Sequence, residues 1–231
     1  MRCAHGVTPH LHQEVTTLAL RLNVNLQDPA DRVLMLAAEV VQAGGVIVYP
    51  TDTLYGLGAN GWNPDAIRRL HSVKRRAGAK PTLVLIHEPA AVGALTDEIT
   101  DAARALMASL WPGPLTLLFR AAPHVPEALT AGSGRIGIRL PASAFCTRLC
   151  ALAGCPVTST SANISGEAAL ATVAAIEDAV GPSVDLFVDG GPLAQVEPST
   201  VIDVSGSVPR LVREGVIPRD RVAHIVPSLL G

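Results

Sequence analysis

Hydrophobic residues along this chain recur at helical spacing in some segments and in short unbroken runs in others. Asp28-Pro29 is suited to a helix start, with aspartate as the cap and proline at the first helical position. Apolar residues from Val33 to Val41 then repeat with the period of an amphipathic helix, which Gly44-Gly45 ends. The run Val46–Tyr49 is typical of a buried strand that ends at Pro50. The pattern therefore predicts a helix followed by a strand.

The same alternation continues to the C-terminus. Asn63-Pro64 opens a second helix, and Trp111-Pro112-Gly113-Pro114 must break a later one. We expect helices over 64–74, 97–110, 144–153 and 171–180, and strands over 82–86, 115–119, 136–140, 156–159, 186–188, 200–204 and 210–212. This interleaving predicts an α/β or α+β single domain with a mixed sheet over residues 28–231. Residues 1–27 lack clear caps and form a poorly specified N-terminal extension, with a short helix around Glu14–Leu22.

Composition narrows the class of protein. Hydrophobic residues make up 48% of the 231 residues and charged residues only 16%, which excludes bulk disorder. No run reaches the roughly 18 apolar residues that span a bilayer, and the first 30 residues lack the apolar core of a signal peptide. We therefore expect a cytoplasmic protein with no membrane segment.

Charge and cysteine spacing exclude further classes of site. The formal net charge is −2, so any anion site must be local. The cysteines form no C-x-x-C pair and have no histidines at zinc-ligand spacing, so we expect no metal site and free thiols in a reducing compartment. They are Cys3, Cys146, Cys150 and Cys155.

Polar residues gather at the ends of predicted strands, where loops on a rigid scaffold usually hold ligands. The loop 50–58 brings Thr51, Asp52 and Thr53 beside glycines that would let a ligand approach the backbone, or it is an ordinary turn. The basic run 74–80 is either a solvated face or a set of cations that converge on a polyanion such as a triphosphate.

Two further clusters follow the same rule. Arg135 and Arg139 flank the strand residues Ile136-Gly137-Ile138. Their spacing of four puts both side chains on one face, where they need either an anion or a salt bridge to acidic residues of the chain. The hydroxyl-rich segment 158–166 follows a strand with more hydroxyls than one helix cap requires, which favours a ligand cradle. Ser199-Thr200 and Arg213 extend this pattern.

Several familiar sites are absent from the sequence. There is no G-x-S-x-G elbow and no evident histidine partner for a serine nucleophile. The Walker sequence is missing, and Gly56-Leu57-Gly58 lacks the further glycine of a dinucleotide fingerprint. If ATP binds, side chains must hold it.

Taken together, six motifs resemble those of the YrdC-like threonylcarbamoyl-AMP synthases, over about residues 43–215. They are PTDTLYGLG (50–58), the K-x-R of Lys74 and Arg76, WPGPLT (111–116), the IR-x-P of 138–141, STSANISG (159–166) and PSTVID (198–203). The resemblance implies a single domain in which a twisted, mostly mixed sheet with flanking helices curves around a basic concave cavity.

The resemblance also implies a nucleotidyltransferase activity. L-threonine, bicarbonate and ATP would give threonylcarbamoyl-AMP and pyrophosphate, with Mg²⁺ on the phosphates and no permanently bound cofactor. Proteins that transfer the threonylcarbamoyl group to tRNA would take the product. It implies threonine contacts from Thr53, Arg139, Ser159 and Ser199; ATP contacts from Arg76, Lys80, Arg135, Ser161, Asn163 and Arg213; and catalytic charge neutralisation by Lys74 and Arg76.

Two other functions stay open. A basic concave face would also suit double-stranded RNA, whereas the 3% aromatic content offers few platforms for stacking single-stranded bases. A carbamoyltransferase-like domain that uses carbamoyl phosphate is the other alternative, although the chain is short for the extra domains of such enzymes.

Overall fold

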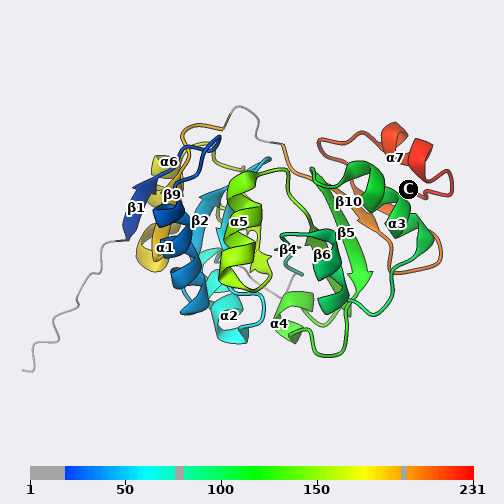
Figure 1. Cartoon of the computed structure of the whole chain (residues 1–231), viewed down its shortest axis with the longest axis horizontal. Coiled ribbons are helices and arrows are strands. Elements are labelled where there is room, and N and C mark those ends of the chain that lie inside the picture. The colour runs from blue at the N-terminus through cyan, green and yellow to red at the C-terminus, as the bar shows by residue number, and fades with distance from the viewer. Residues whose placement is uncertain (1–18, 76–80, 194–196) are drawn as a thin grey trace, which may run out of the picture.

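The fold is a mixed α/β arrangement of two sheets with flanking helices, as expected in class (Figure 1). The computed structural model describes residues 19–75, 81–193 and 197–231. Its strands are β1 (Leu20–Asn23), β2 (Ile47–Pro50), β3 (Tyr55–Gly58), β4 (Val84–Leu85), β5 (Leu115–Arg120), β6 (Arg135–Arg139), β7 (Val157–Thr158), β8 (Thr160–Ser161), β9 (Leu186–Asp189), β10 (Thr200–Asp203) and β11 (Arg210–Arg213). Its helices are α1 (Asp31–Gln42), α2 (Pro64–Val73), α3 (Asp101–Leu110), α4 (Glu127–Thr130), α5 (Ala144–Ala153), α6 (Val173–Val180) and α7 (Arg219–Ile225), with 3-10 turns η1 (Pro89–Ala94) and η2 (Gly181–Ser183).

The described strands form two sheets, where the sequence led us to expect one. The first has the order β1-β9-β2-β3-β8 and the second the order β11-β10-β5-β6-β4-β7. Each contains both parallel and antiparallel pairs: β2 is parallel to β9 and antiparallel to β3, and β5 is parallel to β10 and antiparallel to β6. Strand partners come from distant segments, which explains why local pattern did not reveal the division.

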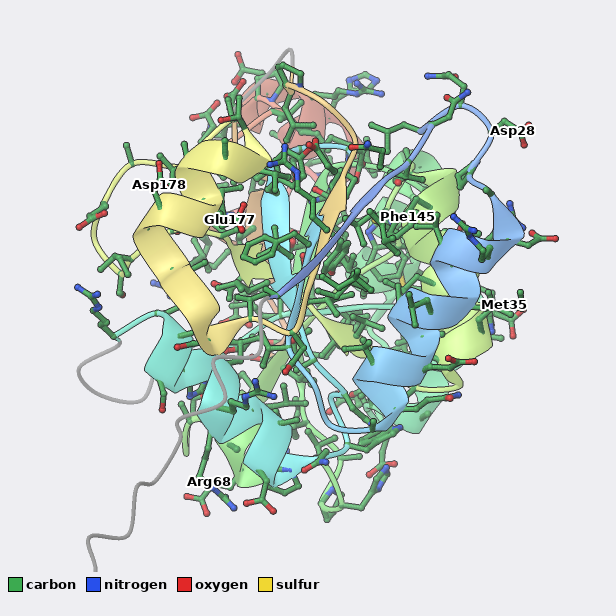
Figure 2. All side chains as sticks on the ribbon, turned by 90° about the vertical axis from the view of Figure 1, so that its left-hand side faces the viewer. Asp28, Met35, Arg68, Phe145, Glu177 and Asp178 are labelled. Atoms are coloured by element: carbon green, nitrogen blue, oxygen red, sulfur yellow. The ribbon has the colours of Figure 1, made fainter. Side chains whose placement is uncertain are left out.

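The first sheet is covered by helices on both faces. Ile47 and Tyr49 of β2 pack with α1 and α5, whereas Val46 and Val48 pack with α2 and α6. Alternate side chains of a strand point to opposite faces, so a strand covered on both faces reads as an unbroken apolar run. Figure 1 shows α1 and α5 side by side on one face of this sheet. In Figure 2 the fully buried Phe145 of α5 lies among these side chains, while Met35 of α1 is at the periphery.

The second sheet carries its main core on one face. Leu117, Ile138 and Ile202, from adjacent strands, pack against the apolar sides of α3 and α7. Trp111-Pro112, a cis peptide, follows α3 and ends it as the sequence predicted.

Helix starts confirm one predicted cap and correct another. The Asn63 side chain accepts hydrogen bonds from the backbone N–H groups of Asp65 and Ala66, with Pro64 at the first helical position. The Asp28 cap was wrong: Ala30 is extended and α1 begins at Asp31, so Asp28 is too far from the unpaired N–H groups of the helix. Figure 2 shows Asp28 at the edge of the molecule, before the helix.

The N-terminal extension contributes a strand to the first sheet. The helix expected around Glu14–Leu22 is wrong at its described end, because Leu20–Asn23 forms β1 and pairs in parallel with β9. Arg21 reinforces this pairing through an ion pair with Asp189 at 2.5 Å. Residues 1–18 lie outside the described residues. Within the described ranges, no helix is long and apolar enough to cross a membrane.

Candidate functional site

A cavity of about 490 Å³ collects most of the polar strand-end residues that the sequence singled out. Both sheets contribute to it, through β3 and β8 of the first and β6 and β11 of the second. Its lining comprises Thr51, Thr53, Leu54, Tyr55, Gly56, Pro81, Thr82, Leu83, Arg139, Ser159, Thr160, Ser161, Asn163, Glu167, Ala169, Pro198, Ser199 and Arg213. Hydroxyls and guanidinium groups therefore face one space.

Arg139 is the most firmly held cation of this cavity. Its residue is only 4% exposed, and its Nε donates to the Gly113 carbonyl at 3.0 Å. Its Nη1 donates to the Thr53 hydroxyl at 2.9 Å. Its Nη2 lies 2.6 Å from a carboxylate oxygen of Asp52 but makes no aligned hydrogen bond there. A planar guanidinium held this rigidly at a cavity wall is suited to binding a carboxylate.

Asp52 is fixed from two sides. One carboxylate oxygen faces Arg139, and the other accepts a hydrogen bond from the Ala142 backbone N–H at 3.1 Å. The neighbouring Thr51 hydroxyl caps its own turn, accepting from the N–H groups of Thr53 and Leu54. The loop after β2 thus acquires its shape from local hydrogen bonds and anchors to the segment after β6.

Lys74 organises the hydroxyl-rich segment 158–166, which is called the serine-rich segment below. It caps the C-terminal end of α2, is 3% exposed, and its Nζ donates to the carbonyls of Ser161 and Asn163 and to the Asn163 side-chain oxygen. The same Asn163 oxygen accepts from the Ser161 hydroxyl at 2.5 Å. The Asn163 amide nitrogen donates to the Glu167 carbonyl. One buried ammonium therefore shapes a loop whose hydroxyls point to the cavity.

Ser199 and Arg213 form a further part of the cavity wall. The Ser199 hydroxyl is 2.9 Å from that of the buried Thr116, and Arg213 donates from Nε and Nη2 to the Ser199 carbonyl. Partial burial and the nearby charge of Arg139 lower the pKa of Arg213 below its ordinary value. Two guanidinium groups that repel each other across a cavity mark a place where an anion is stabilised.

The Thr200 hydroxyl holds the turn that leads away from Arg213. It accepts from the backbone N–H groups of Gly215 and Ile217 and donates to the Ile217 carbonyl at 2.6 Å. Any side chain at Gly215 would bring a Cβ within 2.1 Å of the Pro198 carbonyl oxygen. The end of β11 is therefore locked against the segment that carries Ser199.

Of the glycines after the first loop, Gly56 lines the cavity, and both Gly56 and Gly58 also lie against protein side chains. A Cβ at Gly58 would lie 2.6 Å from the Tyr49 ring, and one at Gly56 would lie 2.9 Å from the Ser159 hydroxyl oxygen. Tyr49 is fully buried and donates to the Thr158 carbonyl. These glycines therefore make room for protein side chains.

The predicted site residues separate into three groups. Thr53, Arg139, Ser159, Ser161, Asn163, Ser199 and Arg213 all line the cavity. Lys74 lies behind the serine-rich segment, and Arg135 is outside the lining, donating to the Ser205 hydroxyl and pairing with Asp203 at 3.4 Å. Arg76 and Lys80 lie outside the described residues.

The sequence left open whether the two arginines of β6 face an anion or form salt bridges within the chain, and both form salt bridges. Arg139 pairs with Asp52 and Arg135 with Asp203. Sequence reasoning placed Asp52 in the right loop without a role, and it missed Thr116 and Glu167. The signal for Asp52 was a carboxylate in a hydroxyl-rich turn. Thr116 is the last residue of the WPGPLT motif and Glu167 follows STSANISG, but neither carried a signal of its own.

The three cysteines in the described part of the chain show no sign of reactivity. Cys146 and Cys150 are buried, and burial raises the pKa of the Cys146 thiol to about 12 and that of the partly buried Cys155 thiol to about 11. Among the described residues, no three His, Cys, Asp or Glu side chains are grouped to hold a metal ion. The polar groups that line the cavity are chiefly hydroxyls, an amide and guanidinium cations.

Comparison with known proteins places these features in one family. The Sua5_yciO_yrdC family model, described as "Telomere recombination", matches residues 39–215. A threonylcarbamoyl-AMP synthase of Pyrococcus abyssi is 31% identical over 196 residues, which cover 85% of this chain and 58% of that protein. A putative threonylcarbamoyl-AMP synthase of Mycobacterium tuberculosis is 32% identical over 201 residues, covering 86% of this chain and 92% of the relative.

Solved structures agree with the sequence relatives. The crystal structure of P. abyssi Sua5 complexed with L-threonine matches with a TM-score of 0.88 and 29% identity, over 92% of this chain and 62% of that chain. Escherichia coli YciO matches with a TM-score of 0.81 and 28% identity, over 89% of this chain and 100% of that chain. The chain thus spans about three fifths of the length of the P. abyssi protein and all of YciO. On its sequence motifs, its fold and these matches, the chain belongs to the Sua5/YciO/YrdC family.

Proposed function

We propose that this chain is an L-threonylcarbamoyladenylate synthase, a nucleotidyltransferase that makes threonylcarbamoyl-AMP and pyrophosphate from L-threonine, bicarbonate and ATP. One observation carries the proposal: Arg139 and Arg213 face the same hydroxyl-lined cavity, which provides two anion-binding positions side by side. The relatives named threonylcarbamoyl-AMP synthase and the relative solved with L-threonine support this choice of substrates.

The threonine site would be centred on Arg139. Its guanidinium lines the cavity and is held from behind by the Gly113 carbonyl, so a substrate carboxylate can bind it in a fixed orientation. The hydroxyls of Thr53, Ser159 and Ser199 line the same cavity and can donate to or accept from the polar groups of an amino acid.

The nucleotide would lie toward Arg213 and the serine-rich segment. Ser161 and Asn163 line the cavity there, and the Lys74 ammonium fixes both residues. We include Arg76, Lys80 and Arg135 among the ATP contacts: Arg76 and Lys80 as the cations that follow Lys74 in the sequence, and Arg135 through a reorientation away from Asp203.

The reaction requires no protein nucleophile. The neutral threonine amine and bicarbonate condense to a carbamate with release of water. A carbamate oxygen then attacks the α-phosphorus, and the bond from that phosphorus to the bridging oxygen breaks to release pyrophosphate. Catalysis would come from positioning the reactants and from neutralising charge by Arg76 and Lys74. Lys74 contributes indirectly as well, because it shapes the loop that carries Ser161.

Mg²⁺ would enter with ATP. The described part of the chain offers no carboxylate cluster for it, which fits an ion held chiefly by phosphate oxygens and water. When bound, it would offset the negative charge of the phosphates.

The product would pass to proteins that transfer the threonylcarbamoyl group to tRNA in the cytoplasm, and direct RNA contact by this chain is a further possibility for that step. A double-stranded RNA-binding module and a carbamoyltransferase-like domain are the alternative functions. Binding of ATP against carbamoyl phosphate, compared by calorimetry, separates the synthase from the carbamoyltransferase.

The decisive experiment is pyrophosphate release from ATP, with and without L-threonine and bicarbonate, and with serine as a substitute. The proposal requires release that depends on both threonine and bicarbonate. ATP binding without such release would contradict it and would favour a binding module or another acceptor.

A further inference from the structure

The charge of Arg139 is offset within the protein, whereas that of Arg213 is not. The Arg139 guanidinium is 2.6 Å from the Asp52 carboxylate. Arg213 donates only to atoms of Ser199, and among the described residues no carboxylate lies within ion-pair distance of it. The cavity therefore has one guanidinium whose charge a protein carboxylate offsets and one whose charge no described carboxylate offsets.

Asp52 is placed so that it offsets the charge of Arg139 whether or not a ligand is bound. Its side chain is 15% exposed and does not line the cavity, so it contacts Arg139 from outside the ligand space. Its second oxygen is occupied by the Ala142 N–H. A carboxylate anchored in this way stays beside the guanidinium when a ligand enters.

The net charge around each guanidinium decides which ligand it accepts. A zwitterionic amino acid carries one carboxylate and one ammonium, and a cationic site would attract the first but repel the second. A triphosphate or pyrophosphate gains most from cations that no protein carboxylate neutralises. Glu167 is the acidic residue of the lining, and it forms no ion pair with Arg139 or Arg213.

We infer that Asp52 is a specificity-determining residue. By neutralising Arg139 it reserves this guanidinium for the zwitterionic amino acid and leaves polyphosphate to Arg213. This inference rests on the proposed function and adds a role that acts through Arg139 rather than on the substrate directly.

The test uses the full chain with Asp52→Asn, which keeps an oxygen for the Ala142 N–H and removes the charge. Calorimetry measures the Kd of L-threonine with and without inorganic pyrophosphate. We expect the Kd of threonine alone to stay within about threefold of the wild-type value, because its carboxylate still binds Arg139. We also expect pyrophosphate to weaken threonine binding by about tenfold more in the variant than in the wild type, because it now competes for Arg139.

Two further variants serve as controls. Asp52→Glu retains the charge and should restore wild-type discrimination. Asp189→Asn removes a carboxylate with nearly the same burial and ion-pair distance, 13% exposed and 2.5 Å from Arg21, and should leave both measurements unchanged.

Each result decides a different point. If pyrophosphate weakens threonine binding in Asp52→Asn no more than in the wild type, the inference is overturned. It is also overturned if both Asp52→Asn and Asp52→Glu lose threonine binding without competition by pyrophosphate, because a folding defect would then explain the loss. Failure of the wild type itself to bind threonine would instead reject the proposed function.

Discussion

The Lys74 ammonium and the Asn163 side-chain oxygen are 3.1 Å apart and joined by a hydrogen bond, which ties the end of α2 to the serine-rich segment 89 residues later in the chain. The same ammonium also donates to the backbone carbonyls of Ser161 and Asn163. A residue that resembles a catalytic cation by motif is thus also part of the framework.

Replacing Lys74 should therefore reduce stability as well as activity. In Lys74→Met the buried carbonyls lose their donor, and we expect the free energy of unfolding to fall by about 1–3 kcal/mol. Urea denaturation measures this change. Arg68→Met is the control, because Arg68 is 64% exposed and its surface ion pair with Asp65 contributes little. Equal stability of the two variants would contradict the framework role.

Arg76 should matter for turnover rather than for folding. We expect Arg76→Ala to lower kcat by about a hundredfold or more, the scale on which one preorganised charge-stabilising donor acts. Steady-state pyrophosphate release gives kcat, and a thermal melt checks that the variant is folded. Wild-type turnover in this variant would remove Arg76 from the proposed nucleotide site.

Gly215 should tolerate no side chain. An alanine Cβ would lie 2.1 Å from the Pro198 carbonyl oxygen, so the turn that follows Arg213 must shift away from Ser199. We expect Gly215→Ala to lower the free energy of unfolding by about 1–3 kcal/mol and to weaken nucleotide binding. Gly206→Ala is a matched control, since its Cβ would meet no atom within 4 Å. Similar losses in both variants would mean that the clash is not the cause.

Stability should fall in alkaline solution because several buried groups resist ionisation. Burial raises the pKa of Cys146 from 9.0 to about 12, of Cys155 from 9.0 to about 11 and of Tyr55 from 10.0 to about 12. The folded state therefore binds more protons than the unfolded state above pH 9. The stability from these neutral groups is fully present below pH 9 and is lost as the pH rises toward 11 and 12.

Urea denaturation at steps from pH 7 to 11 checks this expectation. Cys146→Ala should show a shallower decline above pH 9, because it lacks one of the groups. A flat profile for the wild type up to pH 11 would show that these groups titrate alike in both states.

Local signals in the sequence predicted much of this fold. The helix expected over 144–153 has those bounds in the structure, and the Asn63 cap was confirmed, because both depend on neighbouring residues. The pairing of strands was not predictable in the same way. β4 lies between β6 and β7, and β10 lies between β5 and β11, which only tertiary packing decides.

The candidate site shows the same limit. Strand-end position was enough to gather Thr53, Ser159 and Ser199 around one cavity. It did not distinguish Arg135 from Arg139, which have the same residue type on the same strand. Their partners decide the outcome: Asp203 holds Arg135 at the surface, and Asp52 holds Arg139 in the interior.

The order of strands has a consequence for how the molecule unfolds. The chain builds three strands of the first sheet, four of the second, two more of the first and then two more of the second. Neither sheet is formed by one continuous segment of the chain. The unfolding of one sheet therefore pulls on the chain segments that connect it to the other. Loss of β9 or β10 opens the middle of a sheet, not its border. We therefore expect one cooperative thermal transition, and threonine bound between the sheets should raise its midpoint for both together.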